Sequence, residues 1–232
     1  MEIAAPLPQF DRIARVYRAM EYLSLGPMLE RCRFHFLREA GNARRGLVLG
    51  DGDGRFVARL LAESPHLRAE AVDLSQAMLA LLRKRVAREG AEDRLSTVCA
   101  DARSFEPASR GYDLVATHFF LDCLTEAEMD HMVARLRPRL DPGARWVVSE
   151  FQIPEGRRLK IWLARAMIAG LYSAFGMLTG LTVREIPPWR RLLRSHGFEP
   201  KARRGWLGGL LVAEVWELSE ATLHPAARSH RP

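Results

Sequence analysis

The sequence predicts an α/β protein built on a largely parallel sheet with helices on both faces. Short apolar strands alternate with helical patterns through residues 47–151, as βαβ units require. The first strand, Leu47–Leu49, leads into a turn with alternating glycines at positions 50, 52 and 54, and a helical pattern begins at Arg55. Such a strand–turn–helix unit binds nucleotide-like ligands in many α/β proteins, although it also occurs as a plain tight connection.

An acidic residue ends each of the next two predicted strands. Asp73 follows the strand Ala69–Val72 and lies 19 residues after Gly54, near the spacing of about 20 at which an acid reaches ribose hydroxyls. Asp101 follows the strand Leu95–Ala100. One such acid is commonly a helix cap or a surface charge, whereas two at corresponding strand ends favour a nucleoside site.

The remaining elements continue the alternation and end in a hairpin. Thr125 is a predicted N-cap, and Glu128 completes its capping box. The predicted helices are Gln76–Glu89, Thr125–Leu140 and Trp189–Ser195. The predicted strands are Tyr112–Thr117, Ala144–Phe151, Glu199–Arg204 and Leu210–Leu218, with a turn at Asp141–Gly143.

Five segments resemble, in order and spacing, the motifs of class I S-adenosylmethionine-dependent methyltransferases. They are VLGDGDG, AVDLSQAML, CADARSF, YDLVATHFFLDCL and LRPRLDPGARWVVSEF, and the resemblance covers roughly residues 10–217. The segments FDRIARVY and HFFLDC resemble the small-molecule enzymes of the ubiquinone/menaquinone-biosynthesis type. The resemblance implies a Rossmann-like seven-stranded sheet of order 3-2-1-4-5-7-6 with strand 7 antiparallel. It is more specific for the cofactor than for the methyl acceptor.

The same resemblance assigns a cofactor site for S-adenosyl-L-methionine. The turn would hold the methionine part, Asp73 the ribose hydroxyls, and Asp101 the adenine amino group. The complete set is Tyr17, Gly50, Asp51, Gly52, Asp53, Gly54, Asp73, Leu74, Met78, Asp101, Ala102, Thr117 and His118. The family commonly has an acid at the position of Val48, and Asp51 or Asp53 would substitute for it here.

Two side chains in HFFLDC are candidates for catalysis. His118 has a pKa range suited to proton abstraction, and Asp122 lies in the same segment. Alternatively, His118 only packs or contacts the cofactor, Asp122 only starts a helix, and Tyr17 is a core residue. No metal-binding motif is present, so no metal is expected.

Residues 1–218 are predicted to form one domain, and 219–232 a disordered tail. The apolar spacing of Phe10, Ile13 and Met20 places a helical lid within residues 7–45. Residues 155–187 form a helical insert whose run Ile161–Val183 contains one charge, Arg165. We expect this insert to cap the active site. Contact with a membrane surface is the alternative, whereas its glycines and the basic residues on both sides disfavour a span.

Composition restricts the partners. The net charge of +7 and the pI near 9.9 permit nucleic-acid binding, but the basic residues are spread along the chain without interleaved aromatics. We therefore expect no nucleic-acid partner. Three cysteines without CxxC spacing indicate a reducing compartment, and no signal-peptide pattern begins the chain, so the expected location is the cytoplasm, with the inner membrane face as the alternative.

The sequence thus predicts a methyltransferase that acts on oxygen or carbon of a small, apolar acceptor. A catalytically silent protein that binds S-adenosylmethionine or S-adenosylhomocysteine is the alternative. A nicotinamide-dependent oxidoreductase would have glycine in place of Arg55, and an amino-methylating nucleic-acid enzyme would have NPPY or DPPY in place of THFF. The oligomeric state is not predicted.

Overall fold

The computed structural model describes residues 26–154 and 186–219. The amino-terminal part of the predicted lid, including Tyr17, lies outside the described residues. So do the apolar run Ile161–Val183 and residues 220–232 of the predicted tail.

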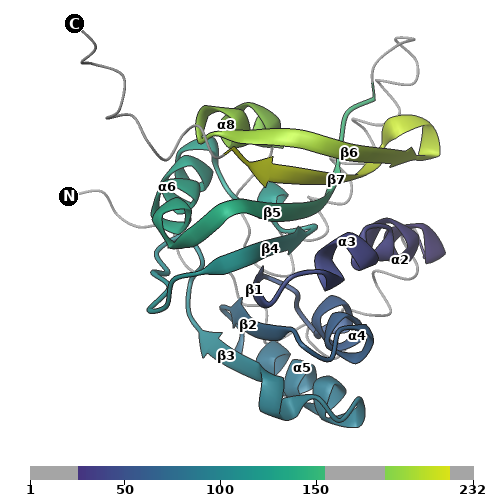
Figure 1. Ribbon diagram of the computed structural model, residues 1–232. Helices are drawn as coiled ribbons and strands as arrows, with labels where there is room; N and C mark the ends of the chain where they lie inside the picture. Colours follow the sequence, from purple (N-terminus) through teal and green to yellow (C-terminus); the bar gives the residue numbers. More distant parts are fainter. Residues whose placement is uncertain (1–25, 155–185, 220–232) are drawn as a thin grey trace, which may run out of the picture.

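Seven strands form a single sheet in the order β3-β2-β1-β4-β5-β7-β6 (Figure 1). Their bounds are β1 Arg45–Leu49, β2 Arg68–Asp73, β3 Leu95–Cys99, β4 Tyr112–His118, β5 Leu140–Phe151, β6 Phe198–Trp206 and β7 Leu211–Leu218. The pairs among the first five strands are parallel, and β7 is antiparallel to both β5 and β6. The predicted strand order and the antiparallel strand 7 are therefore confirmed.

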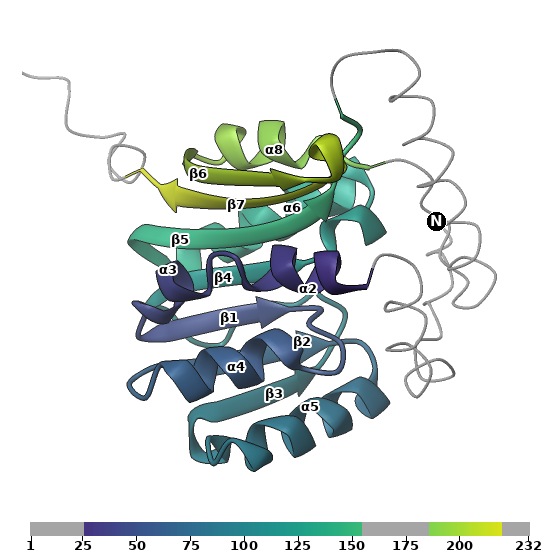
Figure 2. The same ribbon diagram turned by 90° about the vertical axis from the view of Figure 1, so that its right-hand side faces the viewer.

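Helices cover both faces of this sheet. Their bounds are α2 Pro27–Phe34, α3 Leu37–Gly41, α4 Arg55–Glu63, α5 Gln76–Arg88, α6 Glu126–Leu136 and α8 Trp189–Ser195. One core joins α2 to α5 with one face of the sheet, and a second core joins α6 and α8 with the other. Figure 2 shows the first group of helices in front of the sheet.

The inner strands β1, β4 and β7 are buried on both sides, which explains their apolar sequences. Along β1, Leu47 and Leu49 pack into the core of α6 and α8, and Val48 between them packs into the core of α4 and α5. Val48 is 1% exposed, so this position, where the family commonly has an acid, is part of the core.

Two predicted boundaries differ from the structure by more than two residues. The predicted turn at Asp141–Gly143 was wrong. These residues do not form a turn before the fifth strand but lie within it, because β5 begins at Leu140. There the pairing with β4 jumps from Tyr112–Leu140 to Leu114–Arg145, so the extra residues form an irregularity in a continuous strand. The predicted helix Thr125–Leu140 ends as α-helix at Leu136, and a 3-10 turn containing Pro138 follows. The capping box of Thr125 and Glu128 is confirmed.

No helix within residues 26–154 or 186–219 is long and apolar enough to cross a membrane.

Candidate active site

The predicted site residues gather at the carboxyl ends of the parallel strands. The strand order reverses between β1 and β4, because β2 lies on one side of β1 and β4 on the other. In open α/β sheets, ligands bind in the crevice at such a reversal. The glycine-rich turn follows β1, Asp73 ends β2, Asp101 follows β3, and the segment HFFLDC begins at the end of β4.

Two glycines of the turn have steric reasons to be glycine. Gly50 has φ 64, and a Cβ there would lie 2.3 Å from the ring of Phe120. Gly54 has φ 79, and a Cβ there would lie 2.7 Å from the Cα of Leu82 on α5. Gly50 thus permits the loop after β4 to lie against the turn, and Gly54 permits α4 to pack closely on α5.

Asp73 connects the end of β2 to the glycine-rich turn. Its Oδ2 accepts a hydrogen bond from the Gly52 N–H at 3.3 Å, and its Oδ1 accepts one from the Ser75 N–H at 2.9 Å. The Ser75 hydroxyl in turn caps α5 by accepting from the Met78 N–H. The carboxylate is therefore fixed by backbone groups in the position expected of a ribose-binding acid.

The two aspartates inside the turn have different environments. Asp53 is buried and ion-paired, with Arg85 at 2.6 Å and Arg55 at 3.2 Å. Asp51 accepts hydrogen bonds from Val57 N–H at 3.0 Å and Phe56 N–H at 3.4 Å, at the first turn of α4.

Burial raises the pKa of Asp51 to about 7, and the nearby Arg33 guanidinium opposes this shift. Asp51 and Asp53 are the two candidates for replacing the acid missing at Val48, and their partners differ. Asp53 is ion-paired with two arginines, whereas Asp51 lies near one buried cation, Arg33 of α2.

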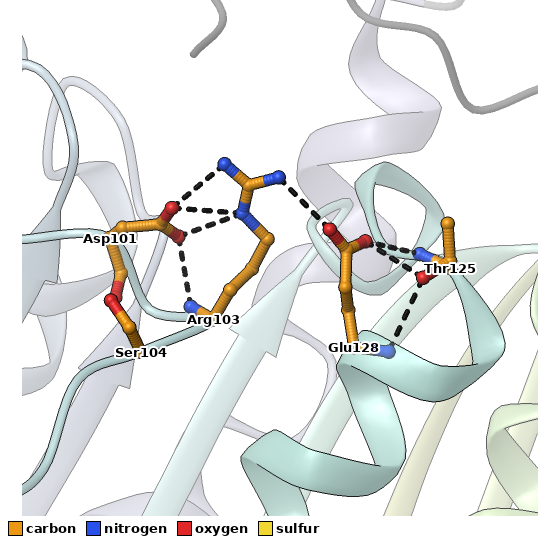
Figure 3. A network of polar contacts seen from close by, with 5 residues as sticks. All are labelled: Asp101, Arg103, Ser104, Thr125 and Glu128. Atoms are coloured by element: carbon orange, nitrogen blue, oxygen red, sulfur yellow. Dashed lines mark hydrogen bonds and ion pairs between the residues drawn. The ribbon is translucent and has the colours of Figure 1, made fainter. Parts of the chain in front are cut away.

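Asp101 belongs to a polar network that joins the loop after β3 to α6 (Figure 3). The Arg103 guanidinium binds Asp101 at 2.7 Å and Glu128 at 3.0 Å. Glu128 also accepts from the backbone and hydroxyl of Thr125. Asp101, which is predicted to receive the adenine amino group, therefore already binds Arg103. The sequence analysis did not predict this role of Arg103.

Other predicted cofactor contacts line or underlie the same edge. Ala102 and Met78 are buried, and Leu74 is half-buried. Thr117 is fully buried, and its hydroxyl accepts from the indole N–H of Trp146 at 3.0 Å. The Thr117 side chain is thus part of the core of α6 and α8.

His118 is a buried histidine at the end of β4. Its Nδ1 lies 2.9 Å from the Ser149 hydroxyl oxygen, and its ring packs on Phe56 with 4.1 Å between centroids. Burial, together with the nearby Arg33 guanidinium, holds the pKa of His118 well below its usual range. His118 is therefore a neutral imidazole at neutral pH.

Asp122 lies near a second buried carboxyl group, Glu150 at the end of β5. Oε1 of Glu150 accepts from the N–H groups of Phe120 at 2.9 Å and Leu121 at 2.7 Å. Burial and the nearby Asp122 raise the pKa of Glu150 well above its usual range. Glu150 fixes the loop that places Phe120 against Gly50. The sequence analysis did not predict this role of Glu150, although an acid at the end of an otherwise apolar strand could have indicated it.

The backbone is strained in this loop. Phe119 has φ 54, a left-handed conformation that is unfavourable for a residue with a Cβ. Its N–H donates to the Ser149 carbonyl at 2.7 Å, and its ring packs on Phe151. Strain of this kind is concentrated at functional sites.

A cavity of about 390 Å³ opens beyond the end of β5. Much of its lining is apolar, from Phe151, Ile153, Ile186 and Trp189, and arginines of α8 complete it. Among the described residues no cluster of potential metal ligands occurs.

Comparison with known proteins agrees with this fold. Residues 47–143 match the family described as "Methyltransferase domain". The chain is 28% identical over 156 residues to a malonyl-[acyl-carrier protein] O-methyltransferase of Paenibacillus sp., covering 66% of this chain and 54% of the relative. It is 30% identical over 113 residues to the ubiquinone/menaquinone biosynthesis C-methyltransferase UbiE of Dinoroseobacter shibae, covering 48% and 44%. The chain thus spans about half the length of these curated relatives.

Solved structures share the fold at low sequence identity. An O-methyltransferase family protein from Burkholderia thailandensis superimposes with a TM-score of 0.63 at 17% identity, covering 91% of this chain and 64% of that one. The N-methyltransferase NodS of Bradyrhizobium japonicum in complex with S-adenosyl-L-homocysteine gives a TM-score of 0.56 at 16% identity, covering 84% and 85%.

The sheet order and the site at its reversal define a Rossmann-like nucleotide-binding fold of the methyltransferase type. Residues 47–143 match a methyltransferase domain, and the curated relatives are named as methyltransferases. These matches agree with the resemblance to class I methyltransferases, whose cofactor is S-adenosylmethionine.

Proposed function

We propose that this protein transfers a methyl group from S-adenosylmethionine to oxygen or carbon of a small, apolar acceptor. The observation that carries the proposal is Asp73, whose carboxylate is held by Gly52 and Ser75 at the reversal of the sheet. A cofactor with a ribose diol requires such a fixed acceptor, and hydrogen bonds to a charged acceptor are stronger than neutral ones.

The residues at the site fit the chemical groups of this cofactor. Its amino-acid end has an ammonium and a carboxylate. The Arg33 guanidinium would bind the carboxylate, and the Asp51 carboxyl group, whose pKa is raised to about 7 in the free protein, would accept from the ammonium. Asp73 would receive the ribose hydroxyls, and Asp101 lies where the adenine amino group is expected. When bound, the cofactor supplies an electrophilic methyl group on a positively charged sulfur.

The chain's own contribution is positioning and exclusion of water. An in-line displacement requires the acceptor atom, the methyl carbon and the sulfur in one line, so rigid placement supplies much of the rate. The loop after β4 is held by Glu150 through two backbone hydrogen bonds, which fixes His118 and Phe120 at the reversal. His118 is neutral and so has a lone pair for the proton of an acceptor hydroxyl, although burial and Arg33 disfavour the protonated imidazole in the free protein.

The cavity beyond β5 supports an apolar acceptor. Phe151, Ile153 and Trp189 offer apolar surface, and Arg194 at its rim suits a polar or anionic substituent. The other two rim arginines are ion-paired, Arg190 with Glu214 and Arg191 with Glu126. Relatives of this chain are named for malonyl-[acyl-carrier protein] and for 3-hydroxy-5-methyl-1-naphthoate, both of which carry an acidic group. We therefore propose an acceptor with an apolar body and one acidic group.

A catalytically silent binding protein is the second candidate. Val48 in place of an acid and the Phe120 ring against Gly50 favour it, since both reduce the polar contacts open to the methionine end. This candidate shares the cofactor with our proposal but has no acceptor.

Calorimetry tests the cofactor. The wild type should bind S-adenosylmethionine and S-adenosylhomocysteine, and Asp73→Ala should bind at least tenfold more weakly. Asp113→Ala is the matched control, because Asp113 also accepts two backbone N–H bonds, from Arg44 and Arg45, but at the start of β4. No binding to the wild type at millimolar ligand would exclude both candidates.

Methyl transfer distinguishes the two candidates. The wild type is incubated with cofactor labelled in its methyl group, together with hydroxynaphthoic acids, malonyl thioesters and a cell extract. Label in a small molecule, absent with Asp73→Ala, is expected. Binding of cofactor without any labelled product would favour the silent protein.

A further inference from the structure

Three buried polar groups form a chain from β4 through β5 to α2. His118 and Ser149 are register partners on β4 and β5. Nδ1 of His118 lies 2.9 Å from Oγ of Ser149, and the Ser149 hydroxyl donates to the carbonyl oxygen of Cys32 at 3.2 Å. His118 is 4% exposed, and Ser149 and Cys32 are fully buried.

This chain couples the imidazole proton of His118 to the Ser149 hydroxyl. A neutral imidazole has one N–H, and a serine hydroxyl has one proton to donate. When the Ser149 proton goes to the Cys32 carbonyl, which also accepts from the His35 N–H, the Ser149 oxygen accepts from Nδ1. In this arrangement Nδ1 holds the imidazole proton, and Nε2 holds a lone pair.

Nε2 is the atom left for a ligand. It is buried and has no hydrogen-bond partner within the part of the chain that the structure describes. Buried polar atoms are nearly always paired, so an unpaired acceptor at the carboxyl edge of β4 indicates a donor supplied from outside the chain. The ring itself is held by Phe56, whose centroid lies 4.1 Å away.

We propose that Ser149 is a positioning residue that holds His118 as the Nδ1–H tautomer, so that Nε2 takes the proton of an acceptor hydroxyl during methyl transfer. The proposal rests on the proposed function and specifies its acceptor as a phenol or enol. The acceptor O–H bond breaks and its proton passes to Nε2. The oxygen electron pair forms the bond to the methyl carbon, and the electrons of the carbon–sulfur bond remain on sulfur, leaving S-adenosylhomocysteine.

The surroundings of His118 keep its imidazole neutral in the free protein. Uncharged groups face it from α4 and β5, namely Phe56 and Ser149, and one cation, Arg33, faces it from α2. Nε2 is closed to solvent, so a neighbouring side chain has to move before an acceptor reaches it.

Nitrogen NMR of the full-length protein labelled with ¹⁵N-histidine tests the tautomer directly. The His118 signals are identified by their loss in His118→Asn. In the wild type we expect Nδ1 protonated and Nε2 unprotonated from pH 6 to 8. Ser149→Ala should give a mixture of tautomers, and Ser149→Thr, which keeps the hydroxyl, should restore the wild-type pattern.

Two results would overturn the inference. A proton on Nε2 in the wild type excludes it, because a protonated nitrogen cannot take the acceptor's proton. An unchanged tautomer in Ser149→Ala removes the role of Ser149. Calorimetry with S-adenosylhomocysteine on the same variants keeps the proposed function separate: Ser149→Ala should bind within about twofold of the wild type, whereas failure of the wild type to bind contradicts the proposed function.

Discussion

Asp51 shows how one residue at the site is governed by opposing effects. Its carboxyl group caps the first turn of α4 through Val57 and Phe56, which stabilises the ionised form. Burial and the neighbouring Asp53 oppose ionisation, Arg33 favours it, and the pKa is raised from 3.8 to about 7. Since burial dominates, this carboxyl group titrates near neutral pH.

The raised pKa of Asp51 predicts a pH-dependent stability. The folded state binds the proton more tightly than the unfolded state, so this contribution is fully present below about pH 4 and is lost as pH rises through about 7. From pH 5 to 8 the free energy of unfolding of the wild type should therefore fall relative to that of Asp51→Asn. The size of the fall is limited by the pKa difference of Asp51 between the folded and unfolded states. Each unit of that difference contributes at most about 1.4 kcal/mol.

Denaturant titrations at each pH measure this difference. The wild type and Asp51→Asn are compared in the same buffers, so that every other titrating group is common to both. Parallel curves for Asp51→Asn and the wild type would contradict the assignment.

At the scale of elements, the contact of α4 with α5 depends on Gly54. Its φ of 79 is unfavourable for other residues, and an added Cβ would lie 2.7 Å from the Leu82 backbone. Gly54→Ala should destabilise the protein by more than about 2 kcal/mol, because conformational strain of about 1–2 kcal/mol adds to the displacement of a helix.

Gly90→Ala is the matched control for Gly54. Gly90 has φ 64, but no atom lies within 4 Å of the added Cβ. This variant should therefore lose only the conformational contribution, about 1–2 kcal/mol. Equal losses for Gly54→Ala and Gly90→Ala in urea unfolding would show that close packing of the two helices is not needed.

The start of α6 has two separable contributions. Thr125 caps the helix by accepting from the Glu128 N–H, and Glu128 completes the box and also binds Arg103 (Figure 3). Thr125→Ala should cost about 1 kcal/mol. Glu128→Ala should cost more, because it also releases Arg103 from one of its two carboxylates. Denaturant unfolding of both variants measures the difference, and a smaller loss for Glu128→Ala would contradict the role of the network.

At the scale of the whole molecule, the candidate site is formed by residues at the ends of five strands. Residues that follow or end β1 to β5 contribute to it, and each strand is held by cores on both faces of the sheet. A ligand bound there contacts loops that are all disrupted on unfolding. Binding should therefore stabilise the domain as a unit.

Ligand binding should be visible in thermal unfolding. S-adenosylhomocysteine at 100 times its Kd should add about 2.7 kcal/mol to the stability of the folded state. For a chain of this size that corresponds to a rise in Tm of about 5–10 °C. Scanning calorimetry or a dye assay measures the shift, which should fall by about half or more in Asp73→Ala at the same ligand concentration. An unchanged Tm in the wild type at millimolar ligand would contradict the cofactor site.

Much of the fold was predictable because its signals are local. The alternation of strands and helices, the Gly50–Gly54 turn and the acids at 73 and 101 could be read from short windows of sequence. The strand order came from the resemblance of the motifs. The extent of β5 was not predictable, since Asp141-Pro142-Gly143 has the composition of a turn and only pairing with β4 and β7 makes it strand.

The sequence by itself determined which elements form and which residues stand at the strand ends, because hydrophobic periodicity, glycine conformation and capping act over a few residues. Only the tertiary structure decided how these residues are used. It assigned Asp53 to Arg85 and Asp101 to Arg103, placed Thr117 in the core, and connected His118 to Ser149 and Cys32. These contacts join strands and helices that are distant along the chain, and side-chain hydrogen bonds and burial depend on that packing.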